Sequence, residues 1–203
     1  MNNAKFGLSA FPVIFLLLFL TIVLQNWQLI SKNKNSVIYT YSRSLSQGEI
    51  GSGFGEAEPH YIPFEQLEPG DIILGGWPNC AYGKYSHAGL YLGNDEVLEA
   101  YVDYGVCIQP LEHYVEYTDL CLIRVEASPA IKKRATIAAR TYAGKLFYPL
   151  AFKNGERYWN CSKIIWKAYA DQDIDLDINH DLWIAPESFR DGGHVTKIYE
   201  KEI

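Results

Sequence analysis

Hydrophobic and polar residues alternate along residues 84–93, KYSHAGLYLG, as they do in a β-strand with two distinct faces. One face suits a packed core, and the other carries the imidazole of His87 between small and aromatic neighbours. The first face holds Ser86, Ala88, Leu90 and Leu92, and the second holds Tyr85, His87, Gly89 and Tyr91. A titratable ring in a strand of this kind needs an explanation from the rest of the chain.

Further apolar segments have the length and the flanking turn residues of strands. They are LEPGDIILG (67–75), VLEAY (97–101), GVCIQP (105–110), LCLIRV (120–125) and the tail HVTKIYE (194–200). Residues 94–96, NDE, predict a turn between the second and third strands. The spacing of these strands and turns predicts a small antiparallel sheet.

Two segments change to the helical period. Ser128 and Pro129 are typical of a helix start, and Gly144 is a C-cap candidate for the helix between them. A second helix is predicted over residues 160–170, NCSKIIWKAYA, with Asn160 as its N-cap. Its apolar stripe is Cys161, Ile164, Ile165, Ala168 and Tyr169. The chain is therefore predicted to be an α+β protein, with the sheet packed on two main helices.

Residues 6–24, FGLSAFPVIFLLLFLTIVL, carry no charge. A helix of this length reaches about 28 Å, close to the hydrocarbon thickness of a bilayer. The following QNWQLISKNK has no A-x-A cleavage site, which favours an uncleaved N-terminal transmembrane helix over a signal peptide. We therefore predict that residues 1–30 are a membrane anchor or signal segment.

Composition changes again after this segment. Residues 31–60 are rich in Ser, Asn, Lys and Gly and predict a flexible linker. Residues 61–203 have the size of one domain, and they contain all the predicted strands and both main helices. We predict one catalytic or binding domain behind a linker.

Charge and metal-ligand spacing exclude several functions. The net charge is −6 and no basic cluster is present, so nucleic acid is not an expected partner. The cysteines are too widely spaced for a zinc site, and the histidines lack the i, i+4 spacing of a helical metal pair. These residues are Cys80, Cys107, Cys121, Cys161, His60, His87, His113, His180 and His194. We expect no metal and no cofactor, and two disulfides remain open.

His87 and Cys161 together indicate a candidate nucleophile and base. Alone, His87 is more often a solvent-facing or hydrogen-bonded core histidine, and Cys161 is a small apolar residue on a stripe. A thiol at a helix N-terminus, however, has a lowered pKa, and a neighbouring histidine can take its proton. Ser162 is another candidate nucleophile on this turn but lies off the stripe. The packing of the helix start toward the sheet favours Cys161 with His87.

The segments EPGDIIL, YSHAGLYLG, VLEAY and WNCSKIIWKAY, in that order, resemble the circularly permuted papain-like amidases of the YiiX type. These enzymes are related to NlpC-type cell-wall peptidases and to lecithin:retinol acyltransferase-like enzymes. The resemblance covers roughly residues 61–200. In ordinary papain-like enzymes the cysteine helix precedes the histidine strand, and here it follows.

The resemblance implies a role for three residues. Cys161 matches the nucleophile, His87 the base, and Glu99 the polar residue that orients the imidazole. Lys163 departs from the family pattern, which has an acidic residue there, and could favour the thiolate or alter substrate preference. Simple hairpin counting over a three-residue turn instead sets Asp103 opposite His87 and Glu99 about 13 Å away, unless a bulge shifts the register. We follow the resemblance for Glu99 and keep Asp103 as the alternative.

The other candidates are weaker. Cys107 and Cys121 fit a core, Cys80 fits an exposed loop, and the four remaining histidines have no visible partner and fit the surface. Several aromatic residues flank the predicted site in the sequence and fit the core or the walls of a cleft. These residues are Tyr85, Tyr91, Tyr158 and Trp159.

The expected function is a cysteine hydrolase that cleaves amide bonds through a thioacyl intermediate, on cell-wall peptides as the resemblance implies. The alternatives are a lipid acyltransferase or acyl hydrolase and an inactive binding module. The expected partners are a peptide or lipid amide or ester and, through the N-terminal helix, a membrane. Flanking positive charges mildly favour a cytoplasmic domain, whereas the cell-wall relatives imply an extracytoplasmic one, which we follow.

Overall fold

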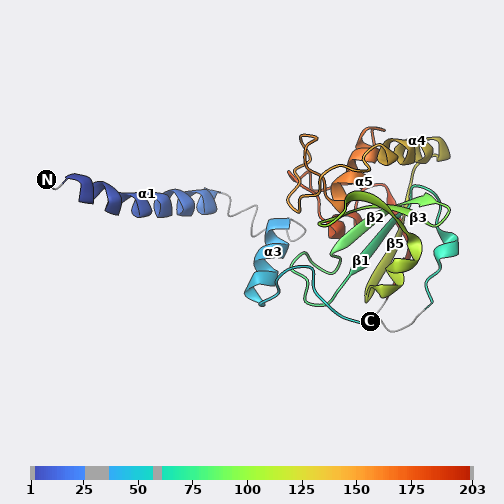
Figure 1. The fold of residues 1–203 in the computed structure, drawn as a ribbon, viewed down its shortest axis with the longest axis horizontal. Helices are drawn as coiled ribbons and strands as arrows, with labels where there is room; N and C mark the ends of the chain where they lie inside the picture. Colours follow the sequence, from blue (N-terminus) through green and yellow to red (C-terminus); the bar gives the residue numbers. More distant parts are fainter. Residues whose placement is uncertain (1–2, 26–36, 57–60, 202–203) are drawn as a thin grey trace.

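The computed structural model describes residues 3–25, 37–56 and 61–201, and its centre is a six-stranded antiparallel sheet (Figure 1). The strand order is β4-β3-β2-β1-β5-β6. The predicted α+β class with an antiparallel sheet is confirmed, including a last strand in the tail. The strands are β1 (Ile72–Gly76), β2 (His87–Gly93), β3 (Glu96–Tyr101), β4 (Gly105–Pro110), β5 (Asp119–Val125) and β6 (Val195–Glu200). The helices are α1 (Asn3–Gln25), α3 (Val37–Ser46), α4 (Pro129–Arg140) and α5 (Cys161–Ala170), with 3-10 turns η1 (Phe64–Gln66), η2 (Leu111–Glu116) and η3 (Pro186–Phe189).

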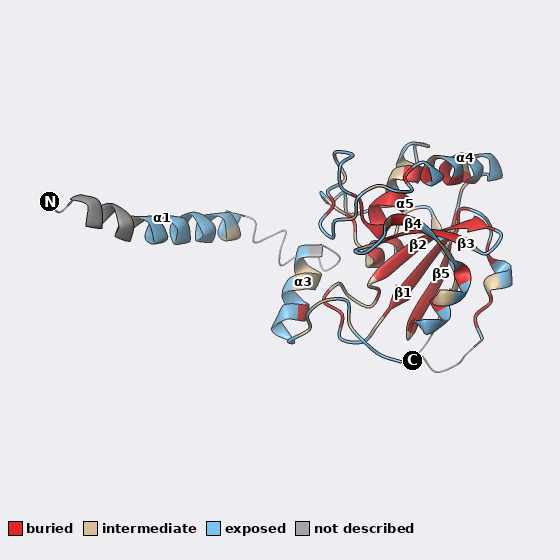
Figure 2. Ribbon diagram, in the orientation of Figure 1, coloured by how far each residue is buried: buried red, intermediate tan, exposed pale blue. Residues whose placement is uncertain are grey.

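Both faces of the inner strands β1, β2, β3 and β5 are buried (Figure 2). On one face, Ala88 and Leu90 of β2 share the larger core with Ile164 and Ile165 of α5. On the other face, Tyr91 belongs to a second core that is built with the segments around η1 and η2. The predicted alternation is confirmed within β2, but Tyr85, predicted on the face of His87, precedes the strand and lies in the larger core. Burial of both faces explains why no residue from 87 to 93 is exposed.

The two main helices begin where their caps predict. Ser128 accepts a hydrogen bond from the N–H of Ile131 at the start of α4, and Asn160 caps α5. The end of α4 differs from the prediction, because the helix stops at Arg140 instead of continuing to Gly144. The N–H of Gly144 donates instead to the carbonyl of Val106 at 2.7 Å. Pairing with β4 therefore ends the helix early.

A buried carboxylate ties the first strand to α4. Asp71, just before β1, accepts hydrogen bonds of 3.0 Å from both Lys132 and Arg124. Because Asp71 is fully buried, these two cations offset the cost of removing its charge from water.

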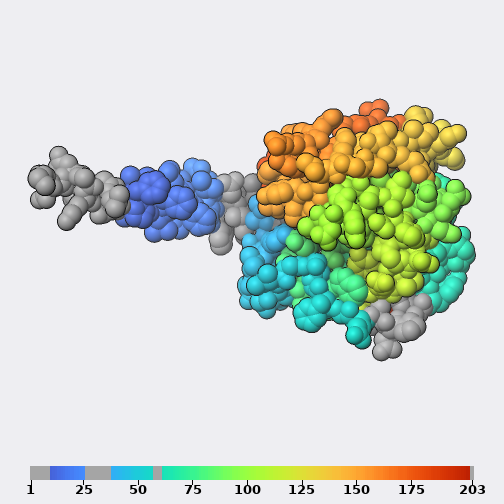
Figure 3. All heavy atoms as spheres, in the orientation of Figure 1, coloured from blue at the N-terminus to red at the C-terminus, as the bar shows by residue number. Residues whose placement is uncertain are grey.

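The N-terminal segment contains a helix, α1, which extends away from the globular part (Figure 3). Its residues from Phe11 to Leu24 include many exposed large apolar side chains. Within the parts of the chain that the structure describes, we find no helix with the length and hydropathy needed to cross a membrane. The transmembrane helix predicted over residues 6–24 is therefore not supported.

Over residues 37–56 the structure differs from the flexible linker that composition predicts. Val37–Ser46 forms α3, and the segment after it hydrogen-bonds to the loop that follows β1. The N–H of Ala81 donates to Gly51 at 2.9 Å, and the N–H of Phe54 donates to Pro78 at 3.2 Å. These contacts order the segment against the domain, although its composition is that of a linker. The other linker residues, 31–36 and 57–60, lie outside the described residues, and so does His60.

Candidate active site

Cys161 is the first residue of α5, and its side chain lines a cavity. Asn160 accepts a hydrogen bond of 2.7 Å from the N–H of Lys163, which fixes the start of the helix. The thiol lies at the positive end of the helix dipole and is 8% exposed. The local sequence thus holds the sulfur where a thiolate is stabilised.

His87 is the first residue of β2 and hydrogen-bonds to Cys161. Burial raises the pKa of the Cys161 thiol, but hydrogen bonds from His87 and from the N–H of Ala88 bring it below its ordinary value of 9.0. Burial lowers the pKa of His87, but its bonds with Cys161 and Glu99 raise it to about 10. The two pKa shifts together favour the form of the pair in which Cys161 is a thiolate and His87 an imidazolium.

Glu99 orients the ring of His87. Its Oε1 lies 3.0 Å from Nε2 of His87, which leaves the Nδ1 atom for the thiol. Both residues are buried, so this contact is made in a region of low dielectric. The contact therefore fixes the orientation of the His87 ring.

The register of β2 and β3 explains why Glu99 rather than Asp103 reaches His87. Asn94 and Asp95 both have positive φ, as the two-residue type I′ turn of a hairpin requires. A bulge lies between Tyr91 and Gly93, and beyond it Leu90 pairs with Leu98. The three-residue turn assumed in simple counting is thus wrong. Glu99 lies diagonally across from His87 on the same face, whereas Asp103 is exposed beyond the end of β3.

A second histidine binds the other carboxylate oxygen. Nε2 of His113 lies 3.3 Å from Oε2 of Glu99, and the hydroxyl of Tyr101 donates to the same oxygen at 3.1 Å. His113 is held in turn by Pro110, whose carbonyl lies 2.5 Å from Nδ1. Burial would raise the pKa of Glu99, but the bonds from His113 and His87 lower it to about 2. The prediction that His113 is a surface residue without a partner is therefore wrong.

Two tyrosine rings enclose the imidazole of His87. The Tyr101 ring stacks on it with centroids 4.6 Å apart, and the Tyr117 ring lies parallel at 6.1 Å. Tyr117 reaches the site across Gly75, which pairs with His87 in the sheet. A Cβ atom on Gly75 would lie 2.6 Å from the Tyr117 ring. The glycine therefore makes room for the second ring.

The cavity beside Cys161 has a volume of about 510 Å³, within the range of small-molecule sites. Its walls come from segments that lie far apart in the chain. These are residues 37–56, which we call the α3 segment, the loop after β1, the end of β3, residues 147–150 and residues 183–186. Tyr101 and Tyr117 form the part of the wall next to His87. The aromatic residues predicted to flank the site do not line this cavity; Trp159 and Tyr85 are core residues, for example.

Lys163, the residue that departs from the family pattern, points away from the cavity. Its ammonium donates to the carbonyls of Gly155 and Tyr158 at 2.7 and 2.9 Å. It therefore holds the loop before α5, and neither effect predicted for it at the thiol has support in these contacts.

Of the four cysteines, Cys161 alone lines the cavity, although Cys107 pairs with Glu99 across β3 and β4. Cys121 is fully buried, as predicted, and Cys107 is half-buried on β4. Cys80 is buried rather than exposed, because the α3 segment covers its loop, and burial raises the pKa of its thiol to about 11. All four cysteines are free thiols in the structure.

Comparison with known proteins agrees with the fold and with the order of its elements. The sequence pattern of the family described as "Permuted papain-like amidase enzyme, YaeF/YiiX, C92 family" matches residues 63–182. The crystal structure of the metalloprotein yiiX from Escherichia coli O157:H7 is 18% identical and has a TM-score of 0.56. That match covers 67% of this chain and 98% of the other. The search of curated proteins gives no match. Within the residues described here, no group of three or more His, Cys, Asp and Glu could hold a metal ion.

Proposed function

Because this chain belongs to the family of permuted papain-like amidases, we propose that it is a cysteine amidase with Cys161 as its nucleophile. The observation that carries the proposal is the contact of Cys161 with His87 and of His87 with Glu99 at the wall of one cavity. The substrate that this family suggests is peptide-like. Each of the three residues then has a distinct chemical role.

The reaction starts from the thiolate and imidazolium pair. The sulfur of Cys161 attacks the carbonyl carbon of the amide, and the negative charge moves to the carbonyl oxygen. The N–H of Cys161, which as the first N–H of α5 has no acceptor within the helix, stabilises that oxygen. His87 then gives its proton to the nitrogen as the C–N bond breaks, which leaves a thioester on Cys161 and a free amine.

Hydrolysis of the thioester regenerates the enzyme. Neutral His87 takes a proton from a water molecule, and the hydroxide attacks the thioester carbonyl. The C–S bond breaks, the acid leaves, and His87 holds the proton opposite the restored thiolate. Glu99 stays ionised throughout and stabilises the imidazolium in both half-reactions.

Mass spectrometry tests the nucleophile directly. With a slow acylating substrate we expect a mass increase on the Cys161 peptide, which Cys161→Ser abolishes at the same reaction time. Iodoacetamide at neutral pH should alkylate Cys161 before Cys107. Cys107→Ser, a change to the partly exposed thiol on β4, is the matched control and should retain turnover. Hydrolysis that survives Cys161→Ala would contradict the proposal, and an unreactive Cys161 would indicate a binding module.

The same thioester can pass its acyl group to an acceptor other than water. Acyl transfer is thus a second candidate. It is supported for apolar acyl groups because the described cavity lining contains no Asp, Glu, Lys or Arg. Product analysis with and without an added amine or alcohol separates the two reactions.

We also propose that the domain acts outside the cytoplasm, which rests on the likeness to enzymes of the cell wall. Protease added to intact cells should then cleave the domain. Protection until lysis would contradict the location and leave the chemistry untouched.

A further inference from the structure

The cavity beside Cys161 is lined by twenty-one described residues, and none of them is Asp, Glu, Lys or Arg. Charged residues make up 21% of the chain, so this lining differs from the rest of the protein. Apart from tyrosine hydroxyls, its ionisable groups are His87 and Cys161, which already pair with each other. A charged group of a substrate would therefore find no fixed partner here.

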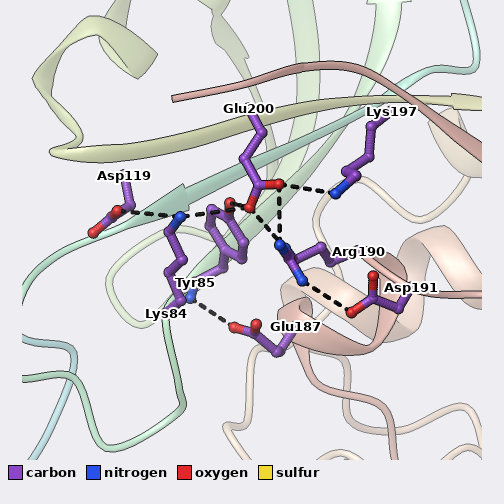
Figure 4. Close-up of polar contacts among 8 residues, drawn as sticks. All are labelled: Lys84, Tyr85, Asp119, Glu187, Arg190, Asp191, Lys197 and Glu200. Carbon is purple, nitrogen blue, oxygen red and sulfur yellow. Dashed lines mark hydrogen bonds and ion pairs between the residues drawn. The ribbon is translucent and has the colours of Figure 1, made fainter. Parts of the chain in front are cut away.

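The charged residues that follow one wall of the cavity in the sequence are bonded to other parts of the domain and do not line the cavity (Figure 4). Glu187 follows the lining residue Pro186, but its carboxylate accepts a hydrogen bond of 3.1 Å from the N–H of Tyr85. Arg190 donates to Glu200 at 2.7 Å. These two bonds tie the residues after the 183–186 wall to Tyr85 and to β6. The wall itself presents Trp183, Ile184, Ala185 and Pro186.

A second wall is fixed to the start of α5. The side-chain N–H of Asn160 donates to the carbonyl of Pro149 at 3.0 Å, and the N–H of Tyr148 donates to Trp159 at 2.8 Å. Phe147, Pro149 and Leu150 thus line the cavity from a segment that is bonded to the residues just before Cys161. These bonds hold an apolar surface next to the proposed nucleophile.

A third wall lies outside the region that the family pattern matches. Tyr41, Gly51 and Ser52 line the cavity from the α3 segment, which precedes the region shared with the family, residues 63–182. The ring of Tyr41 contacts that of Tyr82, another lining residue, with centroids 5.0 Å apart. The α3 segment therefore adds aromatic and uncharged surface to the site.

From these walls we infer that the cavity binds an uncharged, apolar acyl group, the carbonyl of which Cys161 attacks. This inference rests on the proposed amidase function and narrows its substrate. The group is either a fatty acyl chain or the side chain of an apolar amino acid, which share this chemistry. Apolar burial favours such groups, whereas an unpaired carboxylate or ammonium in the cavity loses its hydration without compensation. Peptides with a carboxylate beside the scissile bond are disfavoured.

The test uses amides of one fluorogenic amine, 7-amino-4-methylcoumarin, so that only the acyl side differs. The acyl groups are N-acetyl-leucyl, N-acetyl-glutaminyl, N-acetyl-glutamyl and decanoyl. For the full-length protein we expect kcat/KM to be at least about 100-fold higher for leucyl than for glutamyl, with glutaminyl between them. If kcat/KM is higher for the decanoyl amide than for the leucyl amide, the natural substrate is a lipid. The reverse order indicates a peptide.

Equal kcat/KM for glutamyl and leucyl would overturn this inference and leave the amidase function standing. No turnover of any amide, together with an unreactive Cys161, would instead overturn the proposed function and this inference with it.

A second test introduces a charged residue into the cavity wall and measures the change in substrate preference. Leu150 lines the cavity and is 48% exposed, so Leu150→Arg is compatible with folding. We expect it to lower kcat/KM for leucyl and to raise that for glutamyl by about tenfold, through an ion pair in a partly desolvated site. Leu146→Arg is the matched control, because Leu146 is 63% exposed on the same segment and does not line the cavity. The same change of preference in both variants would overturn the inference.

Discussion

Oε1 of Glu99 lies 3.0 Å from Nε2 of His87, although the two residues are not paired directly across β2 and β3. The contact is diagonal and depends on the bulge between Tyr91 and Gly93. A shift of the register by two residues would move Glu99 along the strand and break it. The orientation of the proposed base is therefore set by the geometry of a hairpin.

Glu99→Gln should lower kcat by at least about 100-fold and change KM little, because Gln removes the charge that stabilises the His87 imidazolium. Asp103→Asn is the matched control, since Asp103 is exposed in the turn that follows β3. Steady-state kinetics of the two variants check this. A large loss only in Asp103→Asn would show that our orienting residue is wrong.

His113→Ala should lower kcat by about tenfold at nearly constant KM. The variant removes one of the donors to Oε2 of Glu99, and a hydrogen bond to a charged group contributes about 1.5–3 kcal/mol. His113→Gln keeps an N–H donor and should recover part of the loss. His180→Ala, at an exposed histidine that lies 3.3 Å from Asp175, is the control. Equal effects of the two alanine variants would mean that His113 has no special role.

The dependence of kcat/KM on pH should be bell-shaped. Activity rises as Cys161 loses its proton, at a pH below the ordinary 9.0 of a thiol, and falls as His87⁺ loses its proton near pH 10. Because Glu99 raises the pKa of His87, Glu99→Gln should move the alkaline limb to lower pH. Thiolate absorbance near neutral pH, compared with Cys161→Ser, checks the acid limb. An alkaline limb that stays in place would contradict the coupling of Glu99 to His87.

Gly89→Ala should lower both stability and kcat. A Cβ atom at this position would lie 2.3 Å from the hydroxyl of Tyr114 and 3.1 Å from Oε1 of Glu99. Overpacking of this kind costs about 1–3 kcal/mol and would displace the carboxylate. Thermal unfolding and kinetics measure the two effects. Adding Tyr114→Phe removes the nearest clashing atom and should restore part of both; no recovery would point to a cause other than this contact.

Several parts of the site can be predicted from local patterns in the sequence. The alternation around His87 predicts its strand, and Asn160 before an apolar stripe predicts the helix that begins at Cys161. These signals are local because strand period and helix caps depend on residues only a few positions apart. The order of the motifs also indicates the family, whose pattern assigns Glu99.

Other features of the site were decided only by the tertiary structure. They depend on contacts between residues distant in sequence or on details of backbone conformation. The two-residue turn and the bulge set the register, and hydrophobic pattern alone does not determine either. His113 has no local signal, because its partner Glu99 is reached only when β3 and η2 pack together. The α3 segment has the composition of a linker and is ordered by contacts with the loop after β1. By itself the sequence determined the strand of His87 and the helix start of Cys161. Packing between distant segments decided which side chains surround them, because cavity walls and shared carboxylates form only in three dimensions.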